Sequence, residues 1–95
     1  MKYIESTRKI IDPFTYYLPT LDVHGFDRDY TILKLREFIE DNLKLGKYHI
    51  VIVHGKGTGI LKNTIHNYLK KDKRVIEYRI NISNLGQTEI FLKRD

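Results

Sequence analysis

The apolar residues of this chain fall into short strand-like runs and longer stripes at helical spacing. A first run, TLDVHG, ends at Gly25, and Asp27 then supplies a side chain typical of the position before a helix. The stripe that follows predicts a helix that ends near Gly46, a residue that tolerates the left-handed backbone of a helix end. Its buried face is expected to consist of Ile32, Leu35, Phe38, Ile39 and Leu43.

The second half of the chain repeats the order of strand and helix and then adds two strands. Residues 49–53 form a β-branched apolar run typical of a buried parallel strand. A helix is expected from about residue 58 to residue 71, and alternating apolar positions predict strands over 75–82 and 88–92. The short turn between these strands predicts an antiparallel hairpin, which gives the order β-α-β-α-β-β. The buried face of the second helix is expected to consist of Leu61, Ile65, Tyr68 and Leu69.

The first 19 residues carry no sustained apolar period. They contain both prolines of the chain and a cluster of aromatic residues. We therefore expect an N-terminal arm over residues 1–19. A chain of 95 residues buries only a small core, so residues 20–95 are expected to form one domain.

The composition excludes several classes of protein. The chain contains no cysteine, which excludes a disulfide scaffold, a thiolate zinc site and a cysteine nucleophile. No stretch approaches the roughly 18 consecutive apolar residues of a membrane span, and the first residues lack the apolar segment of a secretory signal. We expect a cytoplasmic protein with no membrane partner.

The net charge of +5 is concentrated in the middle of the chain. Residues 44–74 hold eight Lys or Arg residues against one Asp, a local charge of +7. Such a surplus favours a polyanionic partner, most simply nucleic acid, because each phosphate contact releases condensed counterions. A basic, solvated helix face that keeps the protein soluble is the alternative.

Two of the predicted strands end in the dipeptide His-Gly just before a helix. If these strands are parallel neighbours, His24 and His54 emerge at the same carboxyl edge of the sheet, where open α/β sheets bind ligands. Side chains alternate along a strand, so Asp22 and His24 share one face and can act on the same group.

A glycine-rich loop, GKGTG at residues 55–59, follows the second His-Gly. Three glycines allow the backbone to approach a ligand closely, and the following helix directs its amides and the positive end of its dipole there. With Lys56 as a mobile cation, the loop is suited to an anion such as a phosphodiester. Its spacing matches neither a Walker A loop nor a dinucleotide-binding fingerprint.

Each of these features also has a purely structural explanation. Asp22 can cap a turn, and His24 or His54 can be a packed imidazole bonded to a carbonyl oxygen. The glycine loop alone is a weak signal for phosphate. His49 and His66 lie away from this edge, and solvated or packed side chains are expected for both.

In combination, the two motifs resemble the Smr (small MutS-related) domain family. The resemblance covers about residues 20–94 and rests on LDVHG at 21–25, VHGKGTGILKNTI at 53–65 and GQTEIFLK at 86–93. It implies a two-layer α/β sandwich, with a mixed four-stranded sheet and two helices, similar to the C-terminal domain of bacterial translation initiation factor three. It also implies nucleic-acid binding, several relatives being endonucleases that nick DNA or cleave RNA, including messenger RNA on stalled or collided ribosomes. The family's Gly-Gly-x-Gly turn keeps only its last glycine here, Gly86.

The favoured hypothesis is an endonuclease, a phosphodiester hydrolase or transesterase, that acts on RNA, with DNA nicking as a further activity. Asp22, His24 and His54 are the expected catalytic residues, His24 acting as general base or acid and Asp22 orienting it. No cofactor is required, although a divalent ion bound through Asp22 is an alternative that so sparse a donor set disfavours. The phosphate is expected to be held by Gly55, Lys56, Gly57, Thr58, Gly59 and Lys62.

Two other functions stay open. A binding module without chemistry would use the same basic surface to dock on ribosomal RNA or another structured nucleic acid. An enzyme acting on a small phosphorylated metabolite ranks last, because 95 residues leave little wall to enclose a substrate.

Overall fold

A computed structural model describes residues 17–94, and its elements follow the predicted order β-α-β-α-β-β. The strands are β1 (Thr20–Asp22), β2 (His49–Val53), β3 (Val75–Ile80) and β4 (Gln87–Leu92). The helices are α1 (Arg28–Lys44) and α2 (Ile60–Leu69). Most of the predicted N-terminal arm lies outside the described residues.

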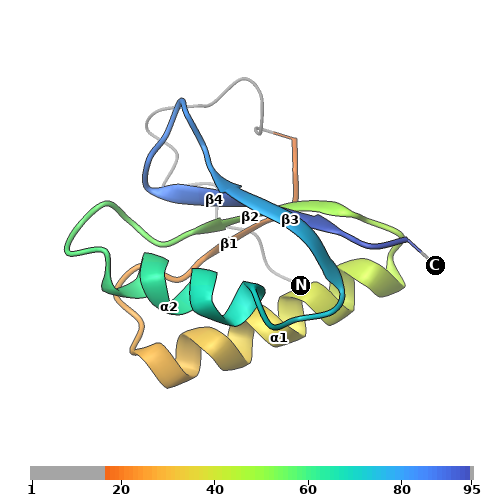
Figure 1. Cartoon of the computed structure of the whole chain (residues 1–95), viewed down its shortest axis with the longest axis horizontal. Coiled ribbons are helices and arrows are strands. Elements are labelled where there is room, and N and C mark those ends of the chain that lie inside the picture. Colours follow the sequence, from red (N-terminus) through yellow and green to blue (C-terminus); the bar gives the residue numbers. More distant parts are fainter. Residues whose placement is uncertain (1–16, 95) are drawn as a thin grey trace.

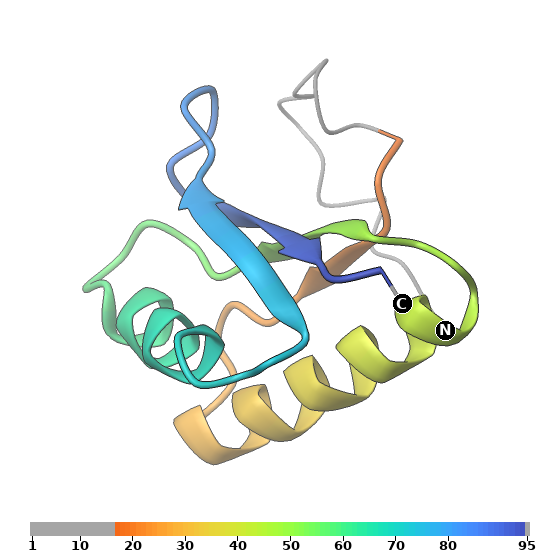
Figure 2. The same cartoon turned by 45° about the vertical axis from the view of Figure 1, so that its right-hand side comes forward.

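The four strands form one mixed sheet in the order β1-β2-β4-β3. The neighbours β1 and β2 are parallel, and β4 runs antiparallel to both β2 and β3. Both helices cover the same face of this sheet, so the domain has two layers (Figures 1 and 2). The predicted architecture is confirmed in the parallel pair, the terminal hairpin and the two helices.

Side chains of α1, α2 and the covered face of the sheet form one core. The helices contribute Leu35, Phe38, Ile39 and Ile65, each fully buried. The sheet contributes Ile50, Ile52 and Ile90 at alternating positions. This alternation follows from the period of two along a strand, which places every second residue on the helix side.

Helix α1 is bounded as the sequence suggests, whereas α2 begins and ends about two residues inside the predicted range 58–71. Asp27 caps α1 with its carboxylate, which accepts a hydrogen bond of 2.8 Å from the amide of Tyr30. Gly46, with a φ of 72°, follows the last turn. The buried stripe of α1 is displaced at both ends: Thr31 and Asn42 are fully buried, whereas Ile32 and Leu43 are only partly buried.

The inward face of β3 departs from the regular alternation expected over residues 75–82. Regular alternation would place Ile76 and Ile82 on the same face as Tyr78, but their exposed fractions are 66% and 95%. A β-bulge between Val75 and Glu77 inserts one extra residue and shifts the alternation, so that Val75 and Tyr78 pack against the core instead. Beyond Ile80 the chain has left the strand.

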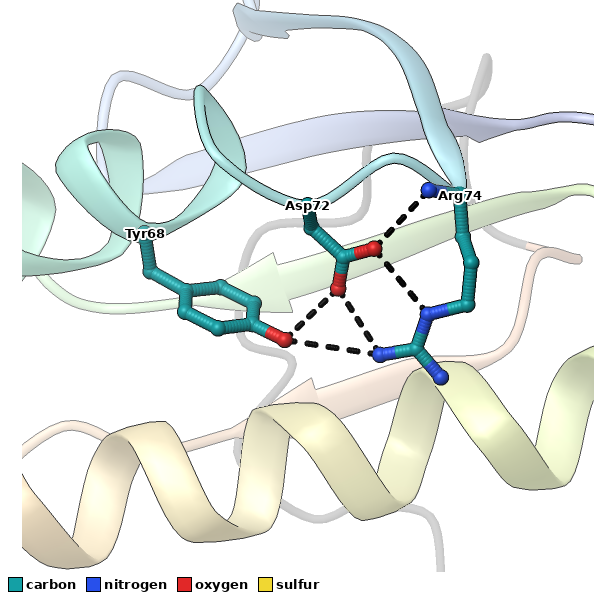
Figure 3. A network of polar contacts seen from close by, with 3 residues as sticks. All are labelled: Tyr68, Asp72 and Arg74. Carbon is teal, nitrogen blue, oxygen red and sulfur yellow. Dashed lines mark hydrogen bonds and ion pairs between the residues drawn. The ribbon is translucent and has the colours of Figure 1, made fainter.

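The turn from α2 into β3 is held by the polar cluster Tyr68, Asp72 and Arg74 (Figure 3). The Asp72 carboxylate accepts hydrogen bonds from the Tyr68 hydroxyl at 2.6 Å and from Arg74 Nη2 at 2.8 Å. It also accepts bonds from the amide and Nε of Arg74. The hydrogen bonds from Arg74 outweigh burial and lower the pKa of Asp72 to about 2.

Replacing Asp72 by asparagine is expected to lower the free energy of unfolding at neutral pH by about 1–2 kcal/mol, because a charged, multiply bonded acceptor is lost. A carboxylate whose folded pKa is depressed stabilises the protein above its unfolded pKa near 4, and this contribution disappears as the pH falls toward 2. Urea unfolding at several pH values measures the difference. The control Glu77→Gln, which loses only an exposed contact of 4.0 Å to Arg79, should change stability by less than about 0.5 kcal/mol.

No helix in the described part of the chain is both long enough and apolar enough to span a membrane.

Candidate functional site

Three chain segments meet at the carboxyl edge of β1 and β2. Asp22 and Val53, the last residues of these strands, are direct partners in the parallel ladder. The hairpin loop 81–86 reaches the same edge, because Gln87 at the start of β4 pairs with Val53. Both helices also begin here, each after a loop that leaves one of the two strands.

Asp22 and His24 form a close pair at this edge. The imidazole Nδ1 of His24 lies 2.5 Å from Oδ1 of Asp22, and the same oxygen accepts a hydrogen bond of 3.0 Å from the His24 amide. The Asp22 side chain is 5% exposed and the His24 side chain 64% exposed. A buried carboxylate thus orients an accessible imidazole.

The hydrogen bond to the carboxylate also fixes the tautomer of His24. A carboxylate oxygen only accepts, so in the neutral imidazole Nδ1 carries the proton and Nε2 is the acceptor. In the described part of the chain Nε2 has no hydrogen-bond partner. This arrangement can remove a proton from a bound group and return it.

His54 does not join this pair, although both histidines follow strands that end side by side. The ladder pairs Asp22 with Val53, so His24 comes opposite Gly55 and His54 comes opposite Val23. Consistent with this offset, a Cβ atom built on Gly55 would lie 3.6 Å from the Cβ atom of His24. His54 therefore faces the helices on the other side of the sheet and is 5% exposed.

Both ring nitrogens of His54 have partners inside the domain. Nδ1 donates to the carbonyl of Gly55 at 2.9 Å, which leaves Nε2 to accept from the Thr88 hydroxyl at 2.8 Å. The Thr88 oxygen in turn accepts from Nε2 of His66 at 2.8 Å. A directed chain of hydrogen bonds thus runs from α2 through β4 to the start of the glycine loop.

The two histidines of this hydrogen-bond chain, His54 and His66, are held neutral. Burial lowers the pKa of His54 and lowers the pKa of His66 to about 4, with further lowering of the latter by His54, Lys62 and Lys70. Neutral rings match the donor and acceptor roles that the hydrogen-bond chain requires. His54 is therefore suited to holding the loop.

Acidification is expected to destabilise the domain through His66. Its folded pKa lies below the unfolded value of 6.5, so its contribution to stability is complete above 6.5 and is lost as the pH falls toward about 4. After a discount for solvent screening of a half-buried ring, the loss is about 2 kcal/mol. The melting temperature of the parent protein should fall as the pH is lowered from 6.5 to about 4. It should fall less for His66→Gln, whose amide can donate to Thr88 without titrating, and an equal fall in both would contradict this assignment.

The glycine loop has donors left for a ligand. The amides of His54 and Gly55 both donate to the carbonyl of Gly86 at 2.9 Å, so Gly55 is already occupied. The amides of residues 56–59 have no hydrogen-bond partner in the described part of the chain. Gly59, with a φ of 82°, then leads into the first turn of α2. Four of the five predicted amide donors are therefore available to an anion.

Gly86 lies at a close approach between two loops. A Cβ built on it would lie 3.4 Å from the carbonyl carbon of Gly55 and from Cγ of Lys56. It would also lie 3.3 Å from the Asn84 side chain, which accepts a hydrogen bond from the Gly86 amide. A larger residue at this position would therefore have to displace the Asn84 side chain by a few tenths of an ångström.

A hollow of about 420 Å³ opens between the loop after β1 and the glycine loop. Gly25, Phe26 and Arg28 line one side, and residues 54–55 and 57–62 line the other. Lys62 is among these residues, and Lys56 lies beside it at a second, smaller hollow. The edge thus combines the Asp22–His24 pair with free amides and cationic side chains.

The comparisons with known proteins identify the family. The family model described as the Smr domain matches residues 21–91. This chain belongs to the Smr domain family. It is 38% identical over 76 residues to "Endonuclease MutS2" of Finegoldia magna, covering 77% of this chain, and 35% identical over 78 residues to the protein of that name from Ligilactobacillus salivarius, covering 79%. The chain spans only 10% of the length of either relative.

Solved Smr domains share this fold. The Smr domain of Thermus thermophilus MutS2 superimposes with a TM-score of 0.78 at 28% identity, over 81% of this chain and all of that one. YdaL, a stand-alone small MutS-related protein from Escherichia coli, superimposes with a TM-score of 0.74 at 19% identity, over 79% of this chain and 64% of that one. The predicted likeness to translation initiation factor three stays a prediction.

In this Smr domain the sequence-predicted residues fall into three groups. Asp22 and His24 form the pair with the exposed imidazole, and residues 55–59 with Lys62 form the cationic side of the edge, where the Gly55 amide is occupied. His54 lies inside the domain. Arg28 was missed, although it directly follows the helix cap of the first His-Gly segment and so was bound to lie at this edge.

No group of three or more His, Asp or Glu side chains that could hold a metal ion occurs among residues 17–94. Asp22 is the acidic group nearest to the free imidazole, and its Oδ1 is already engaged twice by His24. The hypothesis of cleavage without a metal stays a prediction.

Proposed function

We propose that this Smr domain is an RNA endonuclease in which Asp22 and His24 act on a phosphodiester held at the glycine loop. The observation that carries the proposal is the pair itself, a buried carboxylate fixed to an imidazole that is 64% exposed. The relatives named as endonucleases support a nuclease activity. The positive charge of residues 44–74, of which Lys56 and Lys62 lie at the site, supports a polyanionic substrate.

On RNA, the neighbouring 2′-hydroxyl supplies the nucleophile. Nε2 of His24 takes the 2′-hydroxyl proton as the 2′-oxygen bonds to phosphorus and the bond from phosphorus to the 5′-oxygen breaks. The leaving 5′-oxygen takes a proton from water, and the hydroxide so formed takes the proton from the His24 imidazolium. The products are a 2′,3′-cyclic phosphate and a 5′-hydroxyl. Asp22 stabilises the imidazolium formed in this step.

The cationic side of the edge would stabilise the phosphate. The free amides of residues 56–59 would donate hydrogen bonds to the non-bridging phosphate oxygens. The ammonium groups of Lys56 and Lys62 would stabilise the negative charge on them. The Gly55 amide is not available to the phosphate, because it donates to the Gly86 carbonyl, and the Gly55 carbonyl helps to fix the loop by accepting from His54.

The experiment that tests the proposal compares the parent protein with Asp22→Asn on labelled RNA and on DNA of the same sequence. We expect the parent to cut the RNA and Asp22→Asn to cut it at least about tenfold more slowly, because the asparagine amide does not stabilise an imidazolium. Cutting of DNA at an equal rate would contradict the use of the 2′-hydroxyl. No cutting of either substrate would favour the binding module without chemistry.

Lys62→Gln is expected to flatten the salt dependence of RNA binding. Removing one phosphate contact should reduce the slope of log K against log salt by about 0.7 for single-stranded RNA. Titrations at several salt concentrations measure this slope. The matched control Lys44→Gln removes a lysine that pairs with Glu40 at the far end of α1 and should leave the slope unchanged. Equal slopes in parent and Lys62→Gln would remove Lys62 from the phosphate site.

We further propose that the RNA is messenger RNA on stalled ribosomes. This step is supported by the resemblance to ribosome-directed relatives of the Smr family and by the excess of positive charge in residues 44–74. Co-sedimentation of His24→Gln protein with stalled ribosomes, compared with freely translating ribosomes, tests it. Equal recovery in both fractions would contradict the preference.

A further inference from the structure

The hollow beside the Asp22–His24 pair has walls of two chemical kinds. Its volume of about 420 Å³ lies within the range of sites for small organic groups. Phe26, Ile60 and Leu61 give it an apolar wall, and Arg28 and Lys62 add cationic groups. An unpaired nucleotide combines the same two chemistries, a flat apolar base and an anionic phosphate.

Phe26 offers a fixed aromatic ring in this wall. It is partly buried, packs against the hydrophobic core and contacts Tyr30, with 5.0 Å between ring centroids and 53° between planes. Ile60, the first residue of α2, has an exposed fraction of 53%. An ordered ring beside exposed apolar surface loses little conformational entropy when a base stacks on it.

The charges around the hollow suit a phosphate. The acidic side chain among its lining residues, Asp27, is engaged as the cap of α1 through its bond to the Tyr30 amide. Arg28 is exposed and Lys62 is half-buried. A nucleotide whose base entered the hollow would therefore bring its phosphate toward these two cations and toward the free amides of residues 57–59.

We propose that this hollow is a subsite for one unpaired base and that it makes the domain selective for single-stranded RNA. In a duplex both faces of each base are stacked, so a base enters the hollow only after it has left the helix. Neither Asp22 nor His24 lines the hollow, but Gly25 follows His24 in the chain and a Cβ built on Gly55 would lie 3.6 Å from that of His24, so the hollow would take a base from a nucleotide near the cut phosphodiester. The inference rests on the proposed function and names its substrate class.

Binding is measured by fluorescence anisotropy in a His24→Gln background, in which the RNA stays intact. The probes are an unpaired RNA of mixed sequence and a hairpin duplex of similar length. Adding Phe26→Leu, which keeps the apolar packing but removes the ring face, should weaken binding of the unpaired RNA about tenfold and of the duplex less than twofold. Adding Phe26→Tyr should leave both within twofold of the background. The control Leu45→Ala removes an exposed leucine at the other end of α1 and should change neither.

Two outcomes would overturn the inference. One is unchanged affinity of Phe26→Leu for the unpaired RNA at an unchanged melting temperature. The other is an equal loss of affinity for both RNAs, which would indicate a general effect on the surface. Cleavage separates this inference from the proposed function: if Phe26→Leu with His24 intact still cuts both RNAs at the parent rate, the base subsite is wrong and the nuclease assignment stands.

Discussion

Replacing His24 by glutamine is expected to slow RNA cleavage by at least about a hundredfold while changing RNA affinity less than twofold. Glutamine can still donate a hydrogen bond to Asp22, but its amide neither takes nor returns a proton near neutral pH. In the proposed mechanism the imidazole transfers a proton, and with 64% of its side chain exposed it contributes little to packing. Single-turnover cleavage and anisotropy titrations measure the two quantities separately.

His49→Gln is the matched control for this loss. Like His24, His49 pairs with a carboxylate, Glu89, at 3.0 Å; in addition it stacks on the ring of Phe91. It begins β2, at the edge of the sheet opposite to the site. Cleavage by His49→Gln at the parent rate, with a large loss in His24→Gln, would localise the chemistry, whereas equal losses would show that any histidine change disturbs the protein.

Thr88→Val is expected to lower the free energy of unfolding by about 3 kcal/mol and to slow cleavage as well. Valine has nearly the same shape, but it leaves two ring nitrogens, one of His54 and one of His66, without their shared partner. Each unsatisfied polar group in the interior costs about 1–3 kcal/mol. Loss of the hydrogen-bond chain also frees the Gly55 carbonyl at the start of the glycine loop.

The control for Thr88→Val is the same substitution at Thr31, which is also fully buried. The Thr31 hydroxyl donates to the Asp27 carbonyl, which already accepts the Thr31 amide, so its removal leaves no group without a partner. A loss below about 1 kcal/mol is expected there. Urea unfolding compares the two variants, and equal losses would contradict a special role for the chain through Thr88.

The sequence predicts the architecture well, because the architecture follows from hydrophobic period. Strand β2 falls on the predicted residues 49–53, and the cap at Asp27 and the stop at Gly46 lie where expected. The inward face of β3 could not be predicted in the same way. The bulge at Ile76 inserts one residue, so the part of the strand before it has its inward and outward positions interchanged. Nothing in an alternating apolar run marks where such an insertion falls.

The candidate site shows the same sensitivity to a single position. The sequence aligns the two His-Gly dipeptides, but the ladder pairs Asp22 with Val53, so the motifs are offset by one residue. An offset of one moves a side chain to the opposite face of a sheet. His24 therefore faces outward with Asp22, whereas His54 enters the helix side and bonds to Thr88. His66 is next to the buried Ile65 of α2, and this position indicates that its ring can reach Thr88 as well.

The most direct test of the central claim is the chemistry of the cut ends. If His24 activates the 2′-hydroxyl of the substrate, the parent protein should leave a 2′,3′-cyclic phosphate and a 5′-hydroxyl. A single 2′-deoxy substitution at the cut position should abolish cutting there and leave other positions unaffected. Mass spectrometry of the fragments identifies the ends. A 5′-phosphate product, or undiminished cutting at the deoxy position, would contradict the mechanism assigned to the Asp22–His24 pair.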